Sequence, residues 1–275
     1  MAWPDTLPSP NLTYYRENTQ KYFYTSQKGQ ANIRYIMTWL RIAYPQCQYG
    51  SMVAMCGCFN GESSINPATV FGFNNYQYLF NNRKRAFGIC QFVPGCLPRD
   101  HDEQYYQNYH GTNKPIFYYY LKNHSLGSDI TQLYTNTGWA TDMRVQLQYI
   151  RDGNGWKRST SANYDPVYNQ SYSGTFYDFL HNTSYDTGHR TSWFYAAFVR
   201  SGGPSTALPK YIQYANAIYP IFYNEFGTDS PTPDPDPDPP NPDDPDDPGD
   251  DDDDEEPFDK RKSNFLIIAK GSSLF

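Results

Sequence analysis

The sequence predicts a mainly α-helical body with long loops, followed by an extended acidic linker and a short terminal peptide. Apolar residues recur at helical spacing in several segments of the first 230 residues, whereas Pro and Asp dominate the residues that follow. A last apolar run is too short to fold alone. We therefore divide the chain into an irregular lead-in (1–30), a helical body (31–230), a linker (231–257) and a C-terminal peptide (258–275).

The first two predicted helices flank a short turn. Apolar residues at helical spacing occupy residues 33–43, and Pro45 ends this segment. After the turn, Ser51 is the expected N-cap of a second helix rich in small and apolar residues. Glu62 is then expected at, or just beyond, the C-terminal end of the second helix.

The rest of the body alternates loops with shorter helical patterns. Residues 66–85 are rich in Asn and aromatic side chains, and Pro and Gly break any regular element after Gln91. Such loops are where functional side chains usually lie. The later segments with helical patterns are 142–151, 191–199 and 207–225.

The charge of the body differs from that of the whole chain. The linker holds 14 acidic residues, so that the body up to residue 230 has 18 Lys and Arg against 14 Asp and Glu. This mild positive charge suits an anionic polymer such as a cell-wall polysaccharide, but lacks the dense basic patches of nucleic-acid-binding proteins. We expect no nucleic-acid partner, no membrane span and no export signal in this chain.

Five cysteines cannot all pair within one chain, and a body of this size needs no disulfides. We expect reduced, mostly buried thiols. Cys56 and Cys58 would lie about 200° apart around a shared helix, which is unfavourable for gripping one metal ion. The five histidines show no paired spacing and are interpreted as structural. We predict neither a metal site nor a cofactor.

Glu62 has the sequence environment of a general acid. Apolar residues lie close to it in the sequence, and no Lys or Arg is nearer than Arg83. An acid that protonates a glycosidic oxygen near neutral pH needs a raised pKa, which a partly apolar pocket provides. The turn at residues 88–91, Gly-Ile-Cys-Gln, could close over this carboxyl group.

These motifs carry a resemblance to a known family. The chain from residue 31 to about residue 205 resembles the phage tail lysozyme family, whose peptidoglycan-cleaving domains are related in fold to goose-type lysozymes and lytic transglycosylases. The family pattern is a first helix, a small-residue helix ending in Gly-Asn-x-x-x-Glu-Ser, then Asn-Pro, then a Gly-apolar-x-Gln-aromatic turn. Similar elements here are Gly57, Asn60, Glu62, Ser63, Asn66, Pro67, Gly88, Gln91 and Phe92, with Asn60 nearer Glu62 than the pattern has it.

The resemblance implies a lysozyme-like fold and assigns roles. Glu62 would be the catalytic acid/base, and the substrate-binding residues would be Gln91, Ser63, Gly88 and Phe92. Two departures stand out: the aromatic, Asn-rich insertion at 71–85, and the absence near residues 199–204 of a glutamate that the family often has.

Two parts of the site are left open by the sequence. A second carboxylate could come from the acidic loop after the Gln turn, although an exposed loop is the simpler interpretation. Substrate assistance by the N-acetyl group, or internal attack giving an anhydro sugar, needs no second carboxylate. Aromatic side chains could stack on sugar rings. The residues concerned are Asp100, Asp102 and Glu103 for the carboxylate, and Trp139, Trp156 and Trp193 for stacking.

Together these features predict a phage virion enzyme that opens Gram-positive-type peptidoglycan at the tail tip as the genome enters the cell. The protein would be made in the host cytoplasm without a signal peptide and delivered by the particle. Two alternatives stay open: a non-enzymatic tail or receptor-binding protein with a lysozyme-like fold, and a cytosolic endolysin released at lysis. The cleaved bond, by muramidase or transglycosylase chemistry, is also open.

The composition of the C-terminal region predicts an extended chain, in contrast to the helical body. Frequent Pro and repelling Asp side chains keep residues 231–257 extended, with a span of up to roughly 80 Å. Residues 265–269 form a short apolar segment that needs a partner surface. We expect residues 258–275 to dock on another tail protein.

Overall fold

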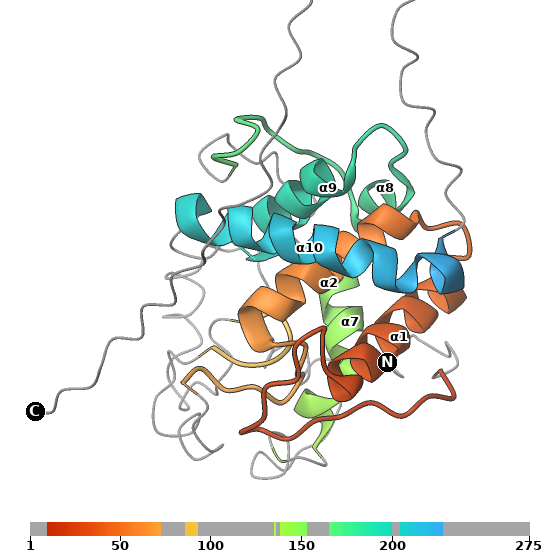
Figure 1. Cartoon of the computed structure of the whole chain (residues 1–275), viewed down its shortest axis with the longest axis vertical. Coiled ribbons are helices and arrows are strands. Elements are labelled where there is room, and N and C mark those ends of the chain that lie inside the picture. Colours follow the sequence, from red (N-terminus) through yellow and green to blue (C-terminus); the bar gives the residue numbers. More distant parts are fainter. Residues whose placement is uncertain are drawn as a thin grey trace, which may run out of the picture. The chain divides into compact units, whose positions relative to one another are not determined.

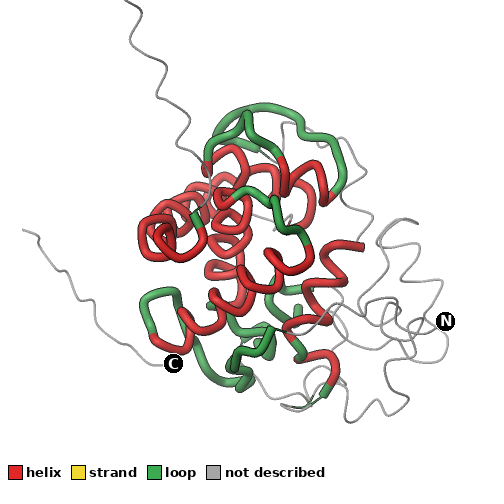
Figure 2. The backbone as a smooth tube through the Cα atoms, turned by 90° about the vertical axis from the view of Figure 1, so that its right-hand side faces the viewer, coloured by secondary structure: helices red, strands yellow, loops and turns green. Residues whose placement is uncertain are grey.

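The computed structural model describes residues 10–72, 86–92, 135, 138–152, 165–199 and 204–227. All of them lie in the first of two compact units, Met1–Ser230 and Pro231–Phe275. In the described ranges the secondary structure is helical and contains no strand beyond isolated bridges, which confirms a mainly α-helical body. Figures 1 and 2 show the helices of this unit and the loops that join them.

Helix α1 (Gln27–Ala43) confirms the first predicted helix. The Oγ of Ser26 accepts a hydrogen bond from the Gly29 backbone, so Ser26 caps a helix that begins earlier than the apolar pattern. Its buried face includes Ile33, Ile36 and Trp39. Each large apolar side chain buried in this way contributes about 1.5–3 kcal/mol to folding.

Helix α2 (Tyr49–Ser63) is the central element. It is buried on all sides except near Gly61 and Glu62, as expected for a helix without a polar face. The predicted N-cap was wrong, because Ser51 lies inside the helix, where its Oγ donates to the Phe179 carbonyl at 2.8 Å. The residue at the N-cap is Gln48.

Helix α10 (Pro204–Phe226) packs along α2, which lies close to it in Figure 1. Two glycines permit the close approach. A Cβ on Gly57 would lie 2.7 Å from the Ala215 Cβ, and a Cβ on Gly61 would lie 2.0 Å from a ring carbon of Tyr211. Contacts under about 3.4 Å are too short for carbon atoms, so glycine is required at both positions.

The remaining elements surround α2. Helix α7 confirms the pattern predicted at 142–151, and α9 continues as a π-helical segment, η4, over the part predicted at 191–199. Helix α8 was not predicted. The bounds are η1 (Trp139–Thr141), α7 (Met143–Asp152), α8 (Phe176–His181), α9 (Thr187–Phe194) and η4 (Tyr195–Val199).

Two further expectations concern thiols and membranes. Cys47, Cys56, Cys58 and Cys90 are free and buried, as predicted, whereas Cys96 lies outside the described residues. Among the described helices, none has the length and apolarity needed to cross a bilayer.

Candidate functional site

Glu62 is the penultimate residue of α2, which confirms its predicted place at a helix end. The next residue but one, Ser64, has a left-handed backbone (φ 56°) and ends the helix. Glu62 is half-buried, between a fully buried helix body and the exposed Gly61. Its carboxyl group is therefore shielded from water by its surroundings and can still be reached.

Tyr211 on α10 is the hydrogen-bond partner of Glu62. Its hydroxyl donates to Glu62 Oε1 over 2.5 Å, and its ring lies against the Cα of Gly61. Sequence reasoning missed Tyr211. The signal available was the pair Gly57 and Gly61, four residues apart, which marks a face where a second helix can approach.

Burial raises the pKa of Glu62, and the hydrogen bond from Tyr211 opposes part of that rise. The position at a helix C-terminus acts in the same direction as burial, because the helix dipole disfavours a negative charge there. Burial and the neighbouring Glu62 carboxylate raise the pKa of Tyr211, so its hydroxyl stays a donor. The pKa of Glu62 is thus shifted in the direction that a general acid requires.

The loop at 86–92 is a tight hairpin held by backbone bonds. Phe87 forms antiparallel bridges with Val70 and with Phe92, and the Gly88 N–H donates to the Thr69 carbonyl at 2.9 Å. Gly88 has φ 85°, which favours glycine. A Cβ there would also lie 2.8 Å from the Gln146 Oε1, so glycine is required for space as well.

Gln91 is oriented by the backbone around it. Its Nε2 donates to the carbonyls of Gly88 (3.0 Å) and Thr69 (3.3 Å). Two carbonyl neighbours fix which end of the amide is the nitrogen, because only that end can donate. In the described part of the chain no group donates to Gln91 Oε1, which can therefore accept a hydrogen bond from a bound molecule.

Gln146 on α7 holds the hairpin through side-chain hydrogen bonds. Sequence reasoning missed this residue as well. Its Oε1 accepts from the Ile89 N–H, and its Nε2 donates to the carbonyls of Pro67 and Ala140, each over 2.6 Å. Nothing in the helical pattern of residues 142–151 distinguishes Gln146 from Gln148. The fully buried amide fixes the hairpin relative to α7 and to the loop after α2.

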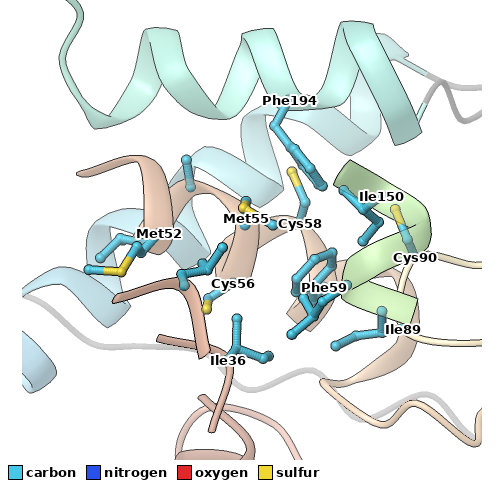
Figure 3. Close-up of a cluster of buried hydrophobic side chains, with 14 of the residues drawn as sticks. Ile36, Met52, Met55, Cys56, Cys58, Phe59, Ile89, Cys90, Ile150 and Phe194 are labelled. Atoms are coloured by element: carbon cyan, nitrogen blue, oxygen red, sulfur yellow. The ribbon is translucent and has the colours of Figure 1, made fainter. Parts of the chain in front are cut away.

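Cys58 lies one helical turn before Glu62 on α2. Burial is the main cause that raises the pKa of the Cys58 thiol, and Cys90 and Glu62 add to the rise. Figure 3 shows Cys58 and Cys90 among the apolar side chains of α2, α7, α9 and the hairpin. Cys58 is therefore part of the buried core that includes the hairpin residues Ile89 and Cys90.

The π-helical segment η4 packs against Tyr211 and against the hairpin residue Phe92. Tyr195 is fully buried, with its ring 5.9 Å from that of Tyr211. The ring centroid of Phe198 lies 6.0 Å from that of Phe92. The Phe92 ring also makes an edge contact with the Tyr149 ring, at a centroid distance of 4.9 Å. π-Helical turns often occur at functional sites, where they change the direction of side chains.

The predicted substrate-binding residues occupy two kinds of place. Gly88 and Gln91 form the hairpin turn, and Gln91 is half-buried. Ser63 and Phe92 are almost fully buried, and the Ser63 Oγ donates to the Phe59 carbonyl at 3.1 Å. Ser63 and Phe92 therefore pack inside the protein. Their contact with a substrate stays a prediction.

The other expected participants are only partly visible. The acidic loop with Asp100, Asp102 and Glu103 lies outside the described residues, as does Trp156. Trp193 is not an exposed sugar platform, because its ring is buried between the rings of Tyr172 and Phe179. Trp139 lies on η1, where the structure describes the backbone.

No group of three or more His, Cys, Asp or Glu side chains within the described ranges could hold a metal ion. Comparison of the sequence with known protein families and with curated proteins gives no match. Any functional conclusion therefore depends on the residues of this chain.

Proposed function

We propose that this protein is a glycosidase that cleaves the glycan strand of peptidoglycan, with Glu62 as the general acid/base. The observation that carries the proposal is the half-buried Glu62 carboxyl group, whose pKa is raised by burial and whose Oε1 accepts a hydrogen bond from Tyr211. A positioned carboxylic acid of raised pKa is the group that protonates the leaving oxygen in glycoside cleavage.

The two oxygens of Glu62 would have separate tasks. Oε1 accepts the hydrogen bond from Tyr211, so the acidic proton belongs on Oε2. That proton moves to the glycosidic oxygen as the bond from this oxygen to the anomeric carbon breaks. The carboxylate left behind, stabilised by Tyr211, then takes a proton from the attacking water, or from a sugar hydroxyl in a transglycosylase.

Gln91 would position the sugar. Its Oε1, to which no described residue donates, accepts from a donor on the substrate, for which the N–H of an N-acetyl group is suitable. The acidic loop with Asp100, Asp102 and Glu103 lies outside the described residues. Either a carboxylate of that loop or the substrate's own N-acetyl or hydroxyl group would act beside Glu62.

We place this activity in a phage virion, at the tail tip, acting on a Gram-positive-type wall during genome delivery. The support is the sequence resemblance around Glu62 and Gln91 and the acidic, Pro-rich linker sequence that precedes an apolar terminal peptide. The alternatives are a non-enzymatic tail or receptor-binding protein and an endolysin. The raised pKa of Glu62 favours an enzyme over a non-enzymatic binding protein.

Mass spectrometry of the fragments that the purified full chain releases from sacculi tests the proposal. Reducing-end muropeptides would indicate hydrolysis, and anhydro-muramic ends would indicate transglycosylation. Release of peptides free of sugar would show that the bond class is wrong. Binding without any release would favour the non-enzymatic tail protein.

A further inference from the structure

The turn that follows Glu62 has an unfavourable backbone. Ser64 and Ile65 both have left-handed φ values, 56° and 58°. Glycine adopts this conformation freely, whereas a β-branched residue such as isoleucine rarely does. Such a turn persists only where surrounding bonds hold it, and such turns cluster at functional sites.

Besides the backbone bonds that end α2, from the Ser64 N–H to the Asn60 carbonyl and from the Ile65 N–H to the Phe59 carbonyl, the turn is held by Asn32 and by the N-terminal segment, residues 10–26, here called the strap. The fully buried Asn32 on α1 donates from Nδ2 to the Ile65 carbonyl at 2.7 Å. The same amide binds the backbone of Tyr15 on both sides, accepting from its N–H (2.7 Å) and donating to its carbonyl (3.0 Å). The Tyr22 N–H donates to the Ser64 carbonyl at 3.3 Å.

Two more buried asparagines bind the strap on either side of the turn. Asn66 donates from Nδ2 to the carbonyls of Glu17 (2.6 Å) and Gln20 (2.8 Å). Asn60, one turn of helix before Ser64, accepts at Oδ1 from the Tyr24 N–H at 2.9 Å. The strap is therefore bound along its length by side-chain amides that lie before, beside and after the strained turn.

We propose that the strap and Asn32 position Glu62 by holding the Ser64–Ile65 turn in its left-handed conformation. Glu62 lies two residues before Ser64, so any relaxation of the turn moves the end of α2 and the carboxyl group with it. The Glu62–Tyr211 bond is made between α2 and α10, and such a shift would lengthen it. Asn32 is a positioning residue, since it acts through the backbone and not on the substrate.

The test first removes the Asn32 hydrogen bonds that hold the turn, and then replaces Ser64, whose backbone is left-handed, by glycine. Asn32→Ala is expected to lower kcat by about 10-fold to 100-fold, with KM changed far less, because misplacement by about 1 Å can cost about 100-fold in rate. Adding Ser64→Gly to Asn32→Ala should restore most of kcat, because glycine holds the left-handed conformation without a brace. An unchanged kcat in Asn32→Ala, well below its Tm, would overturn the proposal, as would a lack of recovery in the double variant.

Thr175→Ala is the matched control. It removes the N-cap of α8, where the Thr175 side chain accepts from the Asp178 N–H, without touching the strap or the turn. It should lower Tm and leave kcat unchanged. If Asn32→Ala does not fold, Asn32→Ser is the milder variant to which the same outcomes apply.

The activity measurement rests on the proposed function, whereas amide hydrogen exchange does not. Exchange over residues 60–66 should become faster in Asn32→Ala and slow again when Ser64→Gly is added. If wild type releases no glycan fragments but exchange follows this pattern, the proposed function fails and the bracing of the turn stands. Exchange unaffected by Asn32→Ala would refute the bracing itself.

Discussion

At the scale of single residues, the two oxygens of Glu62 have different environments. Tyr211 donates to Oε1, while burial makes the charged form less favourable. The two effects oppose each other, and burial dominates, so the pKa is raised. The hydroxyl of Tyr211 therefore limits how far the pKa rises and fixes which oxygen carries the proton.

Tyr211→Phe tests this division. Losing the hydroxyl removes the contribution that lowers the pKa of Glu62, so this pKa should rise further. The alkaline limb of the pH profile of kcat/KM, where Glu62 loses its proton, should move to higher pH. We expect kcat to fall by about 10-fold, because the carboxyl group loses its orientation.

The control for this variant is Tyr214→Phe, one turn further along α10, where the ring contacts Tyr24. It should leave the pH profile unchanged. An alkaline limb that stays in place in Tyr211→Phe would show that Glu62 is not the group whose titration limits the rate.

Gln91→Ala should lower turnover by about 10-fold to 100-fold, less than removal of the acid, because Gln91 orients the substrate and transfers no proton. The variant loses the donor to the Gly88 and Thr69 carbonyls and the free Oε1. Steady-state kinetics on soluble glycan fragments measure the change. The control is Gln213→Ala, which removes an exposed amide on α10. Equal activity of Gln91→Ala and Gln213→Ala would show that the Gly88–Gln91 turn has only a structural role.

At the scale of elements, the contact between α2 and α10 brings the acid and its partner together. Gly57 and Gly61 let the backbone of α2 approach α10, and Gly61 leaves room for the ring of Tyr211. The hairpin is fixed separately, through Gln146 on α7. The site is thus assembled by packing between helices that are distant in the sequence.

Gly61→Ala should disturb both stability and activity. The new Cβ would lie 2.0 Å from a ring carbon of Tyr211, so the ring must move and its bond to Glu62 is lost. We expect a loss of about 1–3 kcal/mol in the free energy of unfolding, measured by urea titration. In a Tyr211→Ala background the same change should cost much less, because the ring is gone. Equal costs in the two backgrounds would contradict the contact.

The sequence predicted those helices whose apolar spacing is regular. Helices α1 and α7 follow the 3.6-residue pattern, and the small-residue composition of α2 placed Glu62 at its end. Helix α10 begins at Pro204, earlier than predicted, because proline suits the first turn of a helix. Helix α8 has only six residues, too few to show a period, and its visible signal is the capping box of Thr175 and Asp178.

The candidate site was less predictable than the helices. Glu62, Gly88 and Gln91 stand in local motifs that can be recognised in the sequence. Tyr211 lies 149 residues from Glu62, and nothing local distinguishes it from the other tyrosines. The left-handed backbone at Ser64 and Ile65 was also unpredictable, because neither residue is a glycine and the bonds from Asn32 and Tyr22 that help to hold it come from distant parts of the sequence. Each residue held in this way costs about 1–3 kcal/mol.

At the scale of the whole molecule, the chain combines a helical unit with a region of opposite composition. The linker carries 14 acidic residues, whereas basic residues outnumber acidic ones in the body. We propose that residues 258–275 dock on another virion protein, most simply by adding residues 265–269 as a strand to an exposed sheet edge. These residues lie outside the described part of the chain.

Deleting residues 258–275 should leave wall-degrading activity unchanged and remove the protein from assembled particles. The reason is that the helical unit holds Glu62 and its partners, while the length and apolar sequence of the terminal peptide predict that it needs a partner surface. Immunoblots of purified particles measure incorporation. Normal incorporation of the shortened chain would show that the body carries the attachment surface.

The most direct test of Glu62 as the general acid compares the release of glycan ends from purified sacculi by wild type, Glu62→Gln and Glu225→Gln. Glu225 is an exposed acid on α10, paired with Arg34 at 2.9 Å, so its variant loses one negative charge away from the site. Because the pKa of Glu62 is raised on folding, the wild type loses stability relative to Glu62→Gln as pH rises above the unfolded value of about 4.5. Glu62→Gln should therefore melt no lower than wild type at pH 7.

We predict that Glu62→Gln releases no new glycan ends from the sacculi while Glu225→Gln releases them at the wild-type rate. Release of glycan ends by a folded Glu62→Gln at the wild-type rate would contradict the assignment of Glu62 as the acid.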